Sequence, residues 1–341
     1  MTDQRAMVER IAAHCEKYQG GIASRSAGQA VLNLAIFAGL AAGMIFCLSV
    51  GLYWLFAILS LVSGGMLTRL FVVQHDCGHG SYFASRKAND RLGQLLSVLT
   101  FTPYGFWRDA HNRHHASSGN LTRRGVGGID TLTVEEFKRL SGWNKFLYRA
   151  YRSPIIILLI GPPLYIIGLQ RLPLEGALPF AETYQSLEFK YIWPSVLALN
   201  FALVVFYGGL SLVFGLGTVA LVFLPPAVMA AWAGGWLFYV QHQYEEAYWQ
   251  ESKDWNFKEA AVLGSSHYVL PKTLQWFSGN IGLHHIHHLC SLIPNYRLQE
   301  CFDASADLKS LPVMTIKDSL KSVPLALWDE TDQKLISFKS L

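Results

Sequence analysis

The sequence predicts an all-α integral membrane protein, with four transmembrane helices in two hairpins and a helical cytoplasmic cap. Only 15% of the 341 residues are charged and 51% are hydrophobic, whereas soluble domains carry about 25% charged residues. The charges are also unevenly placed, because residues 26–68, 153–170 and 191–241 contain no Asp, Glu, Lys, Arg or His. This composition excludes a disordered chain and a disulfide-rich secreted protein.

The first and third uncharged blocks are each long enough for two membrane crossings, since one helix needs roughly 20 apolar residues. We expect the turns at Ser49-Val50-Gly51 and Gly215-Leu216-Gly217, where glycine permits a sharp reversal of the chain. The predicted spans are therefore about 30–50, 53–74, 192–214 and 217–241.

The block 153–170 is shorter and is interrupted by Gly161-Pro162-Pro163, so we expect an interfacial or re-entrant segment there. Lysine and arginine are absent from both outer turns, which places both termini in the cytoplasm by the positive-inside rule. The same rule accounts for the net charge of +4, so the charge does not indicate a nucleic-acid partner. The expected organisation is a cytoplasmic amino-terminal segment at 1–29, a membrane domain at 30–300 and a cytoplasmic carboxy-terminal segment at 301–341. The 5 cysteines are expected to be free thiols.

Nine of the 12 histidines fall into three short clusters, at residues 75–79, 111–115 and 284–288. A helix returns a side chain to the same face after three or four residues, so each cluster can point a group of imidazoles inward. Eight histidines share such faces: His75, His79, His111, His114, His115, His284, His287 and His288.

Such grouping indicates a metal site, because neutral imidazole is a common ligand of zinc, copper, iron and nickel. One histidine alone is most often an ordinary hydrogen-bonded side chain, but that explanation cannot apply independently to three clusters of histidines. Eight ligands exceed the three or four of a single zinc and fit two metals that keep open positions. We therefore predict a dimetal site in the cap, at the cytoplasmic membrane boundary. All three clusters can reach it only if the chain crosses the membrane an even number of times between residues 115 and 284, which favours four spans.

The three clusters, His75-Asp-Cys-Gly-His79, His111-Asn-Arg-His-His115 and His284-His-Ile-His-His288, resemble the histidine boxes of the membrane fatty acid desaturase family. Gly119-Asn-Leu-Thr-Arg-Arg-Gly125 and Gly279-Asn-Ile-Gly-Leu are most similar to its bacterial omega-6 (delta-12) acyl-lipid branch, and the resemblance covers about residues 30–300. The resemblance implies a centre of two non-haem iron ions that uses dioxygen as cosubstrate and two electrons. This centre would remove two hydrogens from an acyl chain of a membrane lipid. The resemblance also implies a multi-pass protein of the bacterial inner membrane with a cytoplasmic active site.

The family also has a ninth ligand at the cytoplasmic end of the fourth span, where His242 stands in this sequence. In animal acyl-CoA desaturases an Asn one turn earlier acts through water. That position is Phe238 here, so the contact is either absent or supplied by Gln241 or Gln243.

The remaining histidines are expected to support the site or lie on the surface. His285 occupies a variable position of the third box, His267 lies outside all boxes, and His14 is expected to have no chemical role. Carboxylates often orient ligand imidazoles by accepting their second N–H. The candidates for this role, each of which fits a solvated position equally well, are Asp76, Asp109, Glu245 and Glu246.

Other functions remain open from the sequence. A related membrane hydroxylase or ketolase acting on alkanes or carotenoids would use similar boxes but insert oxygen. A metal transporter would hold its ligands near the bilayer midplane, whereas every histidine lies outside the uncharged blocks. A zinc protease is disfavoured because the sequence has no HExxH pair. The position of the double bond depends on the depth and bend of an acyl tunnel, which the sequence does not fix.

The electrons are expected to come from an external donor, a ferredoxin or similar small carrier, because the sequence has no recognisable iron–sulfur or haem motif. The cations that could attract an acidic carrier also fit a positive-inside loop without a partner; they are Arg86, Lys87, Arg91, Arg123 and Arg124. Two further motifs are structural. Thr133-Val-Glu-Glu136 predicts a capping box, and Gly125-Val-Gly-Gly128 predicts a flexible turn rather than a phosphate loop.

Overall fold

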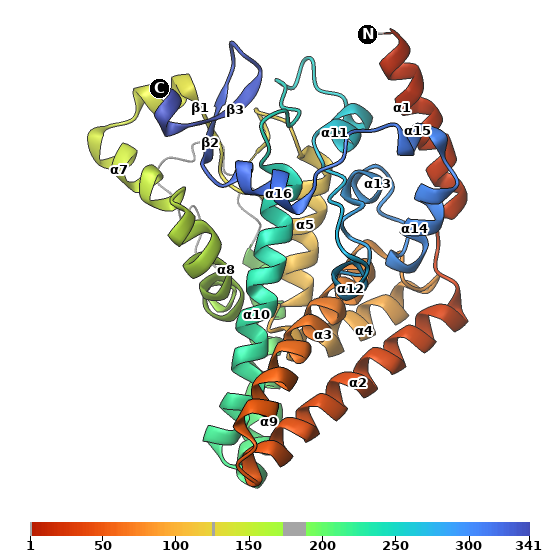
Figure 1. Ribbon diagram of the computed structural model, residues 1–341, viewed down its shortest axis with the longest axis vertical. Helices are drawn as coiled ribbons and strands as arrows, with labels where there is room; N and C mark the ends of the chain where they lie inside the picture. The colour runs from red at the N-terminus through yellow and green to blue at the C-terminus, as the bar shows by residue number, and fades with distance from the viewer. Residues whose placement is uncertain (1, 125–126, 173–188) are drawn as a thin grey trace.

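The computed structural model describes residues 2–124, 127–172 and 189–341. Four of its helices are long and apolar enough to cross a membrane, and they form two hairpins below a broader cap (Figure 1). The first hairpin joins α2 (Ala23–Ser49) to α3 (Tyr53–His79), and the second joins α9 (Phe189–Phe214) to α10 (Leu216–His242). Gly51 and Gly215 reverse the chain with φ of 75° and 83°, values that favour glycine. The predicted helical fold with four membrane-capable helices is confirmed.

Helix α3 is the centre of the membrane part. It packs against α2, α10 and α4 (Arg86–Thr100), and 56% of its most apolar stretch is buried inside the protein, against 11% for α9. Side chains such as Met44, Met66 and Leu70 fill the space between these helices. Helix α9 is thus the most exposed of the four, and α3 is the one best held in place to carry a site.

A bent segment follows α7 (Gly142–Tyr151). It runs through π-helical turns at Ile155–Ile160 and Leu164–Gly168, which flank α8 (Gly161–Pro163), and ends in a 3-10 turn at Leu169–Arg171. Helix α7 and the segment Ile155–Arg171 meet at 50° and together are apolar enough for a broken span or a re-entrant loop. Because prolines remove backbone donors, the regular α-helical bonding shifts here. The predicted interfacial or re-entrant placement stays a prediction, and residues 173–188 lie outside the described part.

The cap is built largely from short helices and packs the amino-terminal helix against helices from the last third of the chain. Helix α1 packs against α11, α13 and α15, and Arg10 of α1 forms an ion pair of 2.9 Å with Asp307. All five cysteines are free and buried, as predicted for thiols. The helices of the cap are α1 (Thr2–Cys15), α4, α5 (Tyr104–Ser117), α6 (Val134–Arg139), α7, α11 (Phe257–Leu263), α12 (Lys272–Phe277), α13 (His284–Leu289), α14 (Asn295–Asp303), α15 (Ala306–Lys309) and α16 (Ile316–Ser319), with 3-10 turns at Glu16–Tyr18, Leu320–Ser322 and Phe338–Ser340.

The cap also contains a three-stranded sheet that the sequence analysis did not anticipate. Strand β1 (Leu132–Thr133) pairs in parallel with β2 (Leu325–Asp329), which pairs antiparallel with β3 (Lys334–Ser337). The predicted capping box lies at the end of β1 and is confirmed. Glu136 N–H donates to Thr133 Oγ1 at 3.2 Å, and Thr133 N–H donates to Glu136 Oε2 at 2.8 Å. The box therefore turns the chain directly from strand into α6.

Candidate metal centre

The first histidine cluster lies in the last turn of α3. His75 and His79 are one helical turn apart, and the helix stops at Gly80, whose φ of 76° is left-handed. The turn from Gln74 to Gly78, with His75, is buried, whereas His79 is partly exposed. The chain then leaves α3 toward α4.

The second cluster lies on one face of α5. Its histidines at 111, 114 and 115 are buried, whereas the intervening Asn112 and Arg113 are exposed. The start of this helix is tied to the membrane part, because the backbone N–H groups of Gly105 and Phe106 donate to Ser195 Oγ of α9 at 3.0 and 3.2 Å. The contact orients α5 so that its histidine face meets the end of α3.

The third cluster forms the short helix α13, which is buried from His284 to His288. A tight turn precedes it, with φ of 56° at Gly279 and 60° at Asn280. His242 is the last residue of α10, and its Nδ1 lies 3.2 Å from the carbonyl oxygen of Gly264. That contact leaves Nε2 of His242 free to face α13 and α5.

The structure brings all nine predicted ligand histidines together from four helices, in two groups. Within each group, one ring nitrogen of every histidine lies within 4.8 Å of those of the others. His284 joins the second group, since its Nε2 lies 3.1 Å from Nε2 of His242. The first group is His75, His79, His111, His115 and His287, and the second is His114, His242 and His288.

The geometry within the groups fits metal ions. The Nε2 atoms of His114 and His242 are 3.1 Å apart, as are those of His115 and His287. Two nitrogens about 2.1 Å from one ion, at angles of 90 to 109°, would lie about 3.0 to 3.4 Å apart. Buried nitrogens without a hydrogen-bond partner, such as His79 Nε2 and His288 Nε2, also belong to these groups.

The electrostatics point the same way. Burial and, secondarily, neighbouring imidazoles lower the pKa of His111, His115 and His287 well below the ordinary value, so these side chains are neutral and able to bind a cation. All four helices have histidines of the site in their last turns. Helix C-termini carry partial negative charge. Neutral ring nitrogens and the partly negative C-terminal ends of four helices therefore converge at the site, which favours a bound cation.

Asp76 is the one carboxylate among the predicted candidates that contacts a ligand histidine in the described part of the chain. Its Oδ1 lies 3.2 Å from Nδ1 of His75, and its Oδ2 accepts from the backbone N–H and the side-chain amide of Asn295 at 2.7 and 2.8 Å. Asp109 instead pairs with Arg108 at 3.0 Å, and Glu245 lies 3.9 Å from Lys334. Glu246 is exposed.

The amides considered beside Phe238 bind elsewhere. Gln241 donates to the carbonyl of Ile281 at 2.8 Å, and Gln243 accepts from Arg152 at 2.7 Å. The ring of Phe238 lies 5.1 Å from that of His114 and 5.4 Å from that of His242. An apolar ring therefore occupies the position that holds an amide in the animal enzymes.

The other histidines stand apart from the two groups. His285 is buried on the far side of α13, with its ring 5.3 Å from that of His267, and burial lowers the pKa of these two to about 3 and about 4. His14 Nε2 lies 2.9 Å from the carbonyl oxygen of Cys301. Neither His285 nor His267 belongs to a group of potential metal ligands.

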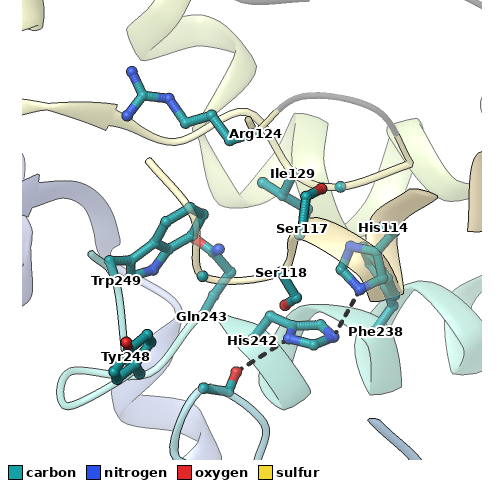
Figure 2. A pocket seen from close by; sticks show the side chains of 13 residues that line it. His114, Ser117, Ser118, Arg124, Ile129, Phe238, His242, Gln243, Tyr248 and Trp249 are labelled. Carbon is teal, nitrogen blue, oxygen red and sulfur yellow. Dashed lines mark hydrogen bonds between the residues drawn. The ribbon is translucent and has the colours of Figure 1, made fainter. Parts of the chain in front are cut away.

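A pocket adjoins the second group, and the sequence analysis identified only part of its lining. Figure 2 shows His114, His242 and Phe238 at one end and Trp249, Tyr248 and Arg124 at the other. Ser117, Ser118, Ile129 and Gln243 complete the labelled wall. These residues come from segments far apart in the sequence, so no local motif marks them. Arg124, which was considered as a cation that could attract an acidic carrier, forms an ion pair with Glu136 and is largely buried.

Comparisons with known proteins agree with this geometry. A family model described as fatty acid desaturase matches residues 52–313. A fatty acid desaturase of Bacillus subtilis (strain 168) is 40% identical over 291 residues, covering 85% of this chain and 79% of that protein. An sn-1 acyl-lipid omega-3 desaturase (ferredoxin) of Synechocystis is 28% identical, covering 82% and 74%, and an endoplasmic-reticulum omega-3 desaturase of Nicotiana tabacum is also 28% identical, covering 81% and 69%. With its membrane-capable helices and its histidine clusters, this chain belongs to the fatty acid desaturase family.

Proposed function

We propose that the protein is a di-iron, dioxygen-dependent membrane enzyme that introduces a double bond into an acyl chain of a membrane lipid. The observation that carries this proposal is the convergence of nine histidines, eight of them buried, at the ends of two membrane-capable helices and in the cap. A purely structural metal site would not need two adjacent groups beside an open pocket. Membership of the desaturase family agrees with the same chemistry.

The proposed ligands follow the two groups. One iron is held by the histidines at 75, 79, 111, 115 and 287, and the other by those at 114, 242, 284 and 288. When bound, the two irons supply the strong oxidant needed to break an unactivated C–H bond. The chain itself holds the imidazoles neutral, and Asp76 fixes the orientation of His75 through its contact with Nδ1.

The overall reaction balances with an external reductant. Two hydrogens leave adjacent carbons of the chain and a C=C bond forms. These two hydrogens, two further protons and two electrons from a donor reduce one dioxygen to two waters. The Synechocystis relative is named for an acyl-lipid substrate and a ferredoxin donor, and we propose the same classes here.

The pocket at the second group adjoins the proposed site of reaction. The apolar ring of Phe238 lies beside the rings of His114 and His242, while polar groups line the other end (Figure 2). From the resemblance of the sequence we propose omega-6 (delta-12) placement of the double bond. Two of the relatives described above are omega-3 desaturases, so the position has to be measured. The proposed location is the bacterial inner membrane, with the site and both termini in the cytoplasm.

Expression in a host whose lipids contain only saturated and monounsaturated chains tests this proposal. Gas chromatography with mass spectrometry of fatty acid methyl esters should reveal a second double bond, and its position gives the regiospecificity. The His287→Ala variant should be present in the membrane and yield none. Hydroxylated chains would identify the hydroxylase alternative instead. Unchanged chains from an iron-loaded wild-type protein would contradict the proposal.

A further inference from the structure

The outer face of α5 is exposed to solvent directly beside ligand histidines of the site. On α3, α10 and α13 the buried runs are Gln74–Gly78, Tyr239–His242 and His284–His288, and His79 at the end of α3 is partly exposed. Helix α5 differs, because it buries its histidines and exposes Asn112 and Arg113 between them and Ala116 after them. Solvent and metal ligands are therefore separated by the width of one helix, roughly 10 Å.

This face of α5 continues onto the start of α4. Asp90 of α4 accepts from Arg108 of α5 at 3.1 Å, so the first turns of α4 lie beside α5. Lys87 and Arg91 are exposed on these turns. We define the basic face as the exposed residues Lys87, Arg91, Asn112, Arg113 and Ala116.

The basic face carries positive charge that the protein does not neutralise. The two acids between residues 86 and 117 are already paired, Asp90 with Arg86 and Arg108 and Asp109 with Arg108. Five cations in the same stretch leave it a net charge of +3. Lys87, Arg91 and Arg113 form no ion pair with any residue that the structure describes. An acidic partner would complement this surface.

Lipid headgroups fit the position of Arg113 less well than a soluble partner does. Helix α5 touches the membrane helix α9 at Gly105 and continues into the cap, where Gly119 accepts from the backbone N–H of Gln250 at 2.9 Å. Arg113 lies about 12 Å along the helix axis from Gly105. The headgroup layer on one side of a bilayer is only about 5 to 8 Å thick.

We propose that the basic face docks a small acidic one-electron carrier protein, such as a ferredoxin, which passes its electrons to the metals across α5. The inference rests on the proposed function and names the docking surface for its electron donor. Two successive dockings oxidise two carriers by one electron each and supply both electrons of the reaction. Opposite charges raise the rate of encounter, and a small contact area lets the oxidised carrier leave.

Stopped-flow oxidation of a reduced acidic [2Fe–2S] ferredoxin tests the proposal, with the iron-loaded protein in nanodiscs of neutral phosphatidylcholine. The test variant is Lys87→Gln/Arg91→Gln/Arg113→Gln. The matched control removes the same charge from three exposed cations elsewhere on the cap, as Lys17→Gln/Arg139→Gln/Lys339→Gln. We expect the second-order rate of the test variant to fall about tenfold or more at about 50 mM salt, and to approach that of wild type at about 500 mM. The control should stay within about twofold of wild type under both conditions.

Several outcomes would overturn the docking surface. An unchanged rate in the test variant would do so, and so would an equal loss in the control. Equal loss of reduction by dithionite would mean that the substitutions act on the metals. If instead the test variant lost only its affinity for vesicles containing anionic phosphatidylglycerol, the face would bind lipid. Wild-type protein that oxidises ferredoxin without forming a double bond would contradict the proposed function while leaving the docking surface intact.

Discussion

Replacing Asp76 with asparagine tests how the chain orients its first metal ligand. The carboxylate accepts three hydrogen bonds, one from Nδ1 of His75 at 3.2 Å and two from Asn295 at 2.7 and 2.8 Å. Asparagine has nearly the same shape, but only its side-chain oxygen accepts hydrogen bonds, whereas its side-chain nitrogen donates them. Asp76→Asn therefore forces a choice between the partners without opening a cavity.

The choice can be worked out from the contacts. Each unsatisfied donor of Asn295 costs about 1 to 3 kcal/mol, so the amide oxygen should stay on the two shorter bonds to Asn295. The amide NH₂ then faces Nδ1 of His75, which favours the tautomer with its proton on Nε2. That proton blocks the nitrogen that would bind the metal. Loss of such an orienting partner lowers metal affinity about 10- to 100-fold, or about 1.4 to 2.8 kcal/mol.

Competition with a chromophoric chelator measures this loss. The metal of the first group should leave Asp76→Asn at about 10- to 100-fold lower chelator concentration than in wild type, while the metal of the second group should be held as before. Asp109→Asn is the control, because its carboxylate pairs with Arg108 and contacts no histidine of the site. Equal affinities in Asp76→Asn and wild type would refute the tautomer argument, and so would an equal loss in the control.

Three further predictions address the ligands, the pH dependence and the topology. His284→Gln should hold one metal per chain by elemental analysis and His285→Gln should hold two, because only His284 lies against the second group; the reverse result would reassign the third box. Burial, opposed by nearby arginines, raises the pKa of Asp130 to about 6, so the folded chain binds more protons than the unfolded one between about pH 4 and 6. The free energy of unfolding should then fall by on the order of 3 kcal/mol as the pH rises from about 4 to about 6. Thermal melts of Asp130→Asn over the same pH range should lack this fall, and the same pH dependence in the variant and wild type would contradict the prediction. Glu182→Cys, at a position outside the described residues, should react with an impermeant maleimide only from the cytoplasmic side, and Ser49→Cys only from outside. The five native cysteines are buried and should give little background labelling. Labelling of residue 182 from outside would contradict the four-span arrangement.

The sequence predicts the parts of the fold and site that local patterns encode. Uncharged blocks predict the four long helices because a bilayer interior excludes charge along a whole span. The spacing within 75–79, 111–115 and 284–288 predicts which histidines share a helix face. His242 has no such local signal, since it is a single residue at the end of α10, and it was identified only through the family resemblance.

Contacts between distant segments could not be predicted in this way. Asn295 lies 219 residues from Asp76, and nothing in either segment marks them as partners. The four candidate carboxylates looked equivalent in sequence, yet only that of Asp76 reaches a ligand imidazole in the described structure. The sheet was missed for the same reason. Strand β1 has two residues and is defined by pairing with β2, almost two hundred positions later.

The convergence of helix ends links the fold to the need for metal. Helices α3, α5, α10 and α13 all have histidines of the site in their last turns, so their partial negative charges meet in one buried volume. Without cations, these ends and the neutral imidazoles would lack counter-charges in a place that water barely enters. Two bound cations would supply those charges and fix the ends of both hairpins relative to the cap. Because the chain collects the ligands from the first hairpin, the second hairpin and the cap, the metals and the membrane fold should stabilise each other.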